Sequence, residues 1–103
     1  MNKQTAIYCR TAEPDPGGIT RQRAALVHLA RERGFSNVAV YEDDGFSARD
    51  CGRPAFARLN QDIREGKIAR VLVTSVTLLE RNIIEVLRWA RESGVEIHPL
   101  RRC

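Results

Sequence analysis

Charged and hydroxyl side chains follow three of the apolar segments in this chain. Arg10 comes directly after the segment TAIYC, Asp43 and Asp44 follow the next segment, and Ser75 ends the strongest one. Guanidinium groups bind phosphate or carboxylate through charge-assisted hydrogen bonds, whereas carboxylates and hydroxyls serve as acids, bases and nucleophiles. Whether these groups act together depends on how the apolar segments are arranged in space.

The chain alternates between short apolar runs and segments with helical periodicity. Apolar, β-branched runs predict strands, and apolar residues recurring every three or four positions predict helices. Gly34, Gly66 and Gly94 follow the helical segments, as glycine often does at helix ends. The predicted strands are residues 5–9, 37–42, 69–75 and 95–100, and the predicted helices are residues 19–33, 53–65 and 81–93.

This strand–helix alternation predicts an α/β fold, a single three-layer domain over residues 1–103 with a mainly parallel sheet. In such sheets, ligands bind outside the carboxyl ends of the strands. Residues 10–18, 43–52 and 75–81 leave those ends. The polar side chains expected there are Arg10, Asp43, Asp44, Arg49, Asp50, Ser75, Thr77 and Arg81, with Arg53 just beyond.

The composition is that of a globular protein, with 43% hydrophobic and 29% charged residues among 103. No apolar run approaches the ~20 residues of a membrane helix, and no signal peptide is evident, so we expect a cytoplasmic protein without membrane contact. The net charge is +4, and all but two of the 17 basic residues are arginines. This excess permits a nucleic-acid partner, and a solvated arginine-rich surface explains it equally well.

The cysteines and histidines predict neither a metal site nor a cofactor. Cys9, Cys51 and Cys103 are odd in number and lack C-x-x-C spacing, which argues against zinc and against a disulfide framework. His28 and His98 stand alone in the sequence.

Four segments, taken in order, resemble the N-terminal catalytic domain of the serine recombinases, the resolvase and invertase family. Together they cover residues from about 5 to 100. They are AIYCR (6–10), TRQRAAL (20–26), YEDDGFSARDCGRPAFARL (41–59) and ARVLVTSVTLLERN (69–82). The resemblance implies a resolvase-like fold and a role in DNA recombination.

In that family a serine two residues after the first arginine attacks a DNA phosphodiester. The reaction leaves a phosphoserine joined to the 5′ end, and no metal takes part. Arginines surround the phosphate because negative charge spreads over its oxygens in the transition state. The resemblance therefore assigns Arg10, Arg53 and Arg81 to a phosphate cradle, with Gln22 and Asp43 in supporting positions.

The sequence departs from the family at the nucleophile. The position two residues after Arg10 is Ala12, and Thr11 is expected to point to the opposite face of an extended chain. Thr77 and Leu78 stand where the family usually carries an Asp-Arg pair. We therefore predict a catalytically inactive domain that acts as a DNA-associated or recombinase-interacting module.

The resemblance also bears on partners. In the family a long helix carries the dimer interface, and a helical DNA-binding domain follows it. Because the sequence ends at PLRRC, we expect a domain that lacks both. We expect DNA, a second copy of the chain or an active recombinase as possible partners.

Several other interpretations stay open at this point. The chain could cleave DNA through an unexpected nucleophile, or it could be an anion- or nucleotide-binding module with Gly17 and Gly18 before a helix. The strand-end arginines could instead pair with nearby aspartates.

Glu42, Asp43 and Asp44 could suggest a magnesium site, although the residues after them fit the recombinase loop. Trp89 and Phe35 could mark a protein-binding surface or pack internally. The aspartates that could pair with the strand-end arginines are Asp43, Asp44 and Asp50.

Overall fold

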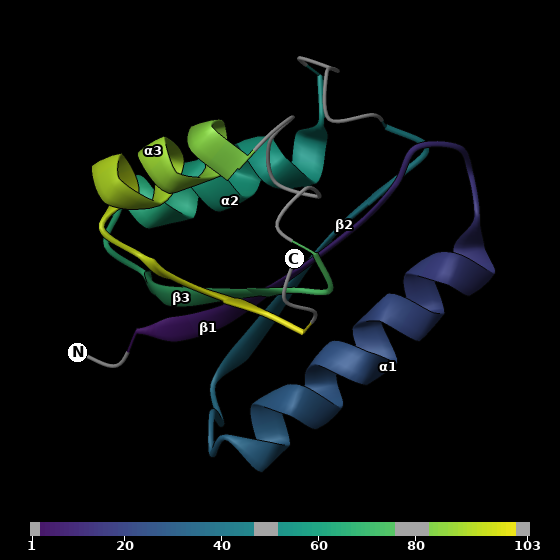
Figure 1. The fold of residues 1–103 in the computed structure, drawn as a ribbon, viewed down its shortest axis with the longest axis horizontal. Helices are drawn as coiled ribbons and strands as arrows, with labels where there is room; N and C mark the ends of the chain where they lie inside the picture. The colour runs from purple at the N-terminus through teal and green to yellow at the C-terminus, as the bar shows by residue number, and fades with distance from the viewer. Residues whose placement is uncertain (1–2, 47–51, 76–82, 101–103) are drawn as a thin grey trace.

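A computed structural model describes residues 3–46, 52–75 and 83–100 of the chain. The strands of the described residues form a parallel sheet in the order β2-β1-β3-β4. Helix α1 covers one face, and α2 and α3 cover the other (Figure 1). This arrangement confirms the three-layer α/β prediction. The elements are β1 (Gln4–Thr11), α1 (Pro16–Glu32), β2 (Val38–Asp44), α2 (Pro54–Arg64), β3 (Ile68–Val73), α3 (Ile83–Ser93) and β4 (Glu96–Pro99).

The central strand β1 is buried on both faces. Ile7 and Cys9 pack with Leu26 of α1, whereas Ala6 and Tyr8 belong to the cluster on the α2 side. All four of these β1 residues are fully buried. Burial on both faces explains why the strand reads as a continuous apolar run rather than an alternating one.

Strand β1 is longer than the sequence predicted. It continues past Cys9, because Arg10 and Thr11 still pair in register with Asp43 and Asp44 of β2. Arg10 therefore lies within the last rungs of the sheet rather than after it.

Helix α1 begins earlier than the predicted start at Ile19. Pro16 occupies the first turn, and the Asp15 carboxylate accepts a hydrogen bond from the Gly18 amide. Proline at this position and an aspartate cap are both strong helix-start signals. The PDPGG segment is thus the cap and first turn of α1.

Two aromatic residues considered as a binding surface make internal contacts. The Trp89 ring lies 5.6 Å from that of Phe56, and its indole N–H donates to Asn60 at 2.6 Å. The Phe35 ring lies under the guanidinium of Arg70, with a separation of 4.1 Å. Packing accounts for the position of both rings.

Several residues singled out in the sequence lie outside the described parts of the chain. They are Arg49, Asp50, Cys51, Thr77, Leu78, Arg81 and Cys103. Within the parts that are described, no helix is both long and apolar enough to cross a membrane.

Candidate active site at the carboxyl edge of the sheet

Strands β1 and β2 end side by side and bring four polar residues together. Arg10 lies opposite Asp43, and Thr11 lies opposite Asp44. Ser75 follows the end of β3, the other neighbour of β1 in the sheet. The parallel sheet thus gathers these side chains at its carboxyl edge, as the strand order predicted.

The side chain of Gln22 holds the main chain of Arg10 at both of its polar groups. The Gln22 Nε2 donates to the Arg10 carbonyl at 2.9 Å, and the Arg10 N–H donates to Gln22 Oε1 at 3.0 Å. Strand β3 pairs with β1 only as far as Ile7 and Leu72. Beyond that rung, Gln22 supplies the hydrogen bonds that a neighbouring strand would otherwise make.

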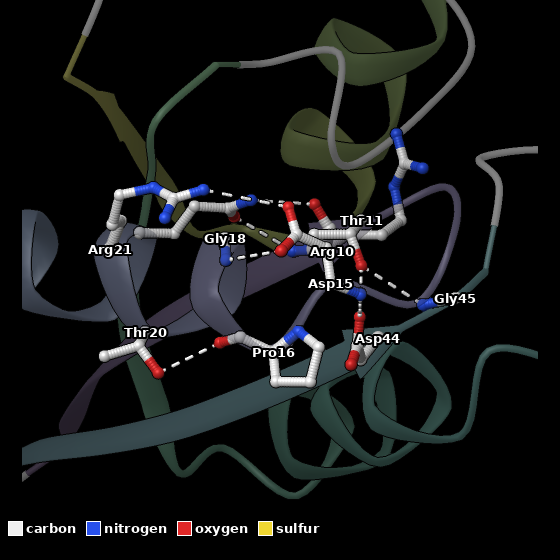
Figure 2. A network of polar contacts seen from close by, with 10 residues as sticks. Arg10, Thr11, Asp15, Pro16, Gly18, Thr20, Arg21, Asp44 and Gly45 are labelled. Carbon is white, nitrogen blue, oxygen red and sulfur yellow. Dashed lines mark hydrogen bonds and ion pairs between the residues drawn. The ribbon is translucent and has the colours of Figure 1, made fainter.

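The Arg10 guanidinium is tied to the segment that follows β2. Its Nη1 donates to the carbonyl of Phe46 at 2.9 Å, and the residue is half-buried. Figure 2 shows the guanidinium extending away from the contacts between Thr11 and Asp44. Gln22 therefore positions the main chain of Arg10, and the guanidinium of Arg10 lies toward Phe46, after the end of β2.

Asp43 caps α2 from a neighbouring element. The carboxylate is completely buried and accepts hydrogen bonds from the amides of Ala55 and Phe56, at 2.9 and 3.0 Å. The residue at the cap position itself, Arg53, makes no side-chain cap hydrogen bond. A carboxylate on β2 thus satisfies amides that a helix start would otherwise leave without an acceptor.

Tyr8 connects Asp43 with Arg53. Its hydroxyl donates to Asp43 Oδ2 at 2.7 Å, and the Arg53 Nη1 lies 3.5 Å from the same hydroxyl. The guanidinium carbon of Arg53 lies 3.9 Å from the centre of the Phe56 ring. Only 5% of Arg53 is exposed, so its charge is held in a largely enclosed setting.

Burial and the neighbouring carboxylate keep the Tyr8 hydroxyl protonated. Burial is the main reason that the pKa of Tyr8 is raised above its ordinary value, and the hydrogen bond to Asp43 raises it further. The positive charges of Arg53 and Arg10 act in the opposite direction. Tyr8 was not among the predicted site residues, because its neighbours in the sequence are apolar and indicate a packing role. The available signal was its position two residues before Arg10, on the same face of the strand.

Thr11 is engaged by Asp44. Its hydroxyl donates to Asp44 Oδ1 at 2.5 Å, and the amide of Asp15 donates to the same oxygen at 2.6 Å (Figure 2). The carbonyl of Thr11 accepts from the amides of Gly45 and Phe46. Asp44 therefore fastens the segment between β1 and α1 to the end of β2.

The two glycines before the body of α1 lie beside the cap of the helix. The Asp15 Oδ1 accepts from the Gly18 amide at 3.0 Å, and a Cβ on Gly18 would come within 2.4 Å of Asp15 Oδ2. A side chain at position 18 would therefore require the Asp15 carboxylate to move from its capping position. The chain's own carboxylate occupies the place where an external phosphate would bind the helix start.

The three consecutive acidic residues of β2 make contacts in different directions. Glu42 pairs with Arg23 at 2.5 Å, Asp43 caps α2, and Asp44 binds Thr11. Within the described parts of the chain, no group of three metal-ligating side chains is placed to hold an ion. The alternation of a strand separates side chains that are adjacent in sequence.

A pocket of about 330 Å³ adjoins this edge, between α1 and the end of β3. Gln22 lines it together with Thr74 and Ser75, and Arg21 lies at its border. Ala12, the remaining candidate residue, is exposed in the segment that leads to α1. The structure therefore brings together Arg10, Gln22, Asp43, Arg53 and Ser75, while Ala12 contributes only a methyl group.

The fold and this edge define the class: a three-layer α/β domain with arginines and their supporting side chains at the carboxyl ends of parallel strands. Residues 5–102 match the family model described as "Resolvase, N terminal domain". The chain belongs to the resolvase N-terminal domain family.

Solved structures of an integrase domain and of recombinases share the fold. The N-terminal catalytic domain of TP901-1 integrase is 28% identical, with a TM-score of 0.82 over 95% of this chain and 78% of that one. The C-terminal catalytic domain of ISC1926 TnpA, an IS607-like serine recombinase, is 23% identical, with a TM-score of 0.82 over 97% of this chain and 71% of its own.

A resolvase family site-specific recombinase from Streptococcus pneumoniae is 23% identical, with a TM-score of 0.76 over 95% of this chain and 72% of that protein. The comparison with curated proteins returned no match.

Proposed function

We propose that this chain is a recombinase-type domain that retains part of a phosphate-binding site and does not cleave DNA. The observation that carries the proposal is Ala12, which places a methyl group two residues after Arg10. A phosphoserine intermediate needs an oxygen nucleophile at that position. Loss of a catalytic nucleophile lowers turnover by on the order of a millionfold.

Thr11 does not replace the missing serine in this proposal. Its hydroxyl donates to Asp44, and consecutive residues of a strand project to opposite faces. A DNA phosphate held by Arg10 would therefore meet no free hydroxyl from Thr11. This arrangement favours the inactive domain over an enzyme that uses the neighbouring residue.

The supporting residues favour a surviving phosphate contact. Gln22 fixes the main chain of Arg10, and Asp43 with Tyr8 fixes the environment of Arg53. In our proposal the half-buried Arg10 binds a DNA phosphodiester through a charge-assisted hydrogen bond worth ~1.5–3 kcal/mol, and the buried Arg53 adds positive charge behind it. Arg81, the third cradle residue by resemblance, lies outside the described residues.

The role we propose is that of a DNA-associated or recombinase-interacting module in the cytoplasm. The net charge of +4 favours association with a polyanion. Pairing with a second copy or with an active recombinase would let the domain modulate strand exchange without performing it.

The proposal is tested with a pool of nicked duplexes of random sequence, designed so that any covalent intermediate is trapped. Denaturing gels report adducts for the natural chain, the triple variant Ala12→Ser, Thr77→Asp and Leu78→Arg, and the control Ala24→Ser, whose exposed site lies on α1. We expect no adduct from the natural chain or the control. An adduct from the natural chain would overturn the proposal, and one from the triple variant alone would support it.

Binding of the same duplexes is followed in parallel by fluorescence anisotropy. Arg10→Gln should weaken binding by about tenfold, the loss of one charge-assisted contact, while the exposed Arg88→Gln should not. Equal losses in both variants would argue against a phosphate contact at the carboxyl edge. Co-elution with an active serine recombinase, measured by size-exclusion chromatography, tests the partner role separately.

A further inference from the structure

A hollow of about 660 Å³ lies at the amino edge of the sheet, at the opposite end of β1 from the candidate active site. Lys3 and Thr5 border it at the start of β1, and Arg33, Phe35 and Asn37 border it from the connection between α1 and β2. Arg70 of β3 completes the side chains considered below. The length of β1 from Thr5 to Thr11, about 20 Å, separates the two regions.

Positive charge accumulates in this hollow from three parts of the chain. Lys3, Arg33 and Arg70 line it, and none of them is close to another in the sequence. Among the described residues, the acidic side chain that pairs with one of these cations is Glu96, which is 68% exposed and lies 3.9 Å from Arg70 Nε. One carboxylate against three cations leaves a net positive hollow.

Arg70 is held in a fixed orientation. Its guanidinium lies over the Phe35 ring at 4.1 Å, and its Nη1 donates to the Thr5 hydroxyl at 2.9 Å. Its buried Nε has no hydrogen-bond partner among the described residues, since Glu96 at 3.9 Å is too far to accept one. A planar guanidinium positioned in this way presents its donors and charge with little loss of side-chain freedom.

The nearby carboxylate is engaged by His98. Arg33 Nη1 contacts His98 Nδ1 at 2.7 Å, and His98 Nε2 contacts Glu96 Oε1 at 2.9 Å. Because arginine can only donate, Nδ1 is the acceptor, and Nε2 carries the proton that is donated to Glu96. Glu96 therefore directs a carboxylate oxygen to a neutral imidazole, which leaves the charges of Arg33 and Arg70 incompletely compensated.

We propose that this hollow binds a phosphate group, carried either by a nucleic-acid backbone or by a small phosphate compound. Arg33, Arg70 and Lys3 supply the charge, and the side-chain amide of Asn37 supplies a neutral donor. Phosphate suits this set because it offers several acceptor oxygens to donors that converge from different segments. The site is separate from the carboxyl edge, so the inference does not depend on the proposed function.

The test uses the full chain labelled with ¹⁵N and follows backbone amides and arginine Nε–H signals by NMR. Sodium pyrophosphate is added at constant ionic strength, and a short DNA duplex is added in a second series. We expect the signals of Phe35, Asn37 and Arg70 to shift and to saturate with a Kd of about 1 mM or tighter. The amides of Arg10 and Gln22 report the carboxyl edge in the same spectra.

Two variants distinguish a built site from general charge attraction. Arg33→Gln removes an exposed side chain and should weaken binding by about tenfold, whereas the control Arg88→Gln on α3 should leave it unchanged. Saturation by pyrophosphate alone identifies a small phosphate compound, and saturation by DNA identifies a nucleic-acid backbone. No saturable shift with either probe, or equal weakening by both variants, would overturn the inference.

Discussion

The side-chain amide of Gln22 and the main chain of Arg10 form a closed pair of hydrogen bonds, with lengths of 2.9 and 3.0 Å. Strand β3 no longer pairs with β1 at this level, so a residue of α1 completes the hydrogen bonding of the strand. The position of Arg10 therefore depends on how α1 packs against the sheet as well as on the sheet itself.

Gln22→Met tests this dependence, because methionine has a similar shape but cannot make either hydrogen bond. We expect the Arg10 amide to exchange with solvent at least about tenfold faster and the free energy of unfolding to fall by ~1–2 kcal/mol. Hydrogen exchange followed by NMR measures the first effect, and urea denaturation measures the second. Gln61→Met, at an exposed site on α2, is the control. An unchanged exchange rate of the Arg10 amide would contradict the role assigned to the Gln22 side chain.

Tyr8→Phe should destabilise the domain by removing one hydrogen bond to the buried Asp43. The carboxylate keeps its two amide donors, so we expect a loss of ~1–3 kcal/mol rather than complete unfolding. Urea denaturation gives this value. Tyr41→Phe is the matched comparison, since Tyr41 also donates to an aspartate, Asp62, but in a less buried contact. A loss for Tyr8→Phe no larger than that for Tyr41→Phe would argue against an added contribution from the buried hydrogen bond between Tyr8 and Asp43.

Thr11→Val should loosen the segment between β1 and α1. The substitution removes the hydroxyl that donates to Asp44 while keeping the β-branched shape, at an expected cost of ~1 kcal/mol. Amide exchange at Asp15 should become faster, because its hydrogen bond shares the same carboxylate oxygen. Thr20→Val removes an exposed hydroxyl on α1 and serves as the control (Figure 2). Equal effects of the two variants would show that Thr11 has no special role.

Alkaline solutions should destabilise the domain through Cys9 and Tyr8. Burial raises the pKa of Cys9 to about 12, and it also raises the pKa of Tyr8. Because both groups ionise more readily in the unfolded chain, unfolding releases protons above the ordinary pKa values. Stability is therefore complete below about pH 8.5 and falls as the pH rises toward the folded-state pKa values.

Urea denaturation across this pH range tests the alkaline effect. Cys9→Ala should give a shallower decline than the natural chain, because one of the buried groups that release a proton on unfolding is gone. The native thiol of Cys9 should also react slowly with a thiol reagent at about pH 8, since the thiolate is the reactive form. A decline of the same slope in Cys9→Ala would contradict a contribution from Cys9.

The order of strands and helices could be predicted from the sequence because each segment carries its own periodicity. The run from Val71 to Val73 is apolar on both faces, and it forms a fully buried part of β3. The segment boundaries were less certain, because local patterns do not show pairing. Thr11 belongs to β1 only because Asp44 lies opposite it in a neighbouring strand.

The candidate site was predicted in part. The strand order placed Arg10 and Asp43 at one edge, and the family resemblance added Gln22 and Arg53. Nothing in the local pattern around Tyr8 distinguished its hydroxyl from the ring of a packing residue. Its role depends on Asp43, which lies 35 positions further along the chain.

The alternation of elements, the excess of arginine and the presence of Ala12 after Arg10 and Thr11 follow from the residues alone. Which groups meet depends on the folded chain: Asp43 caps α2, Gln22 completes β1, and Arg33 and Arg70 converge at the amino edge. The physical reason is that periodicity reports which face of an element is buried. Hydrogen bonds and charge clusters between distant segments depend on strand register and helix packing, which are set only when the whole chain folds.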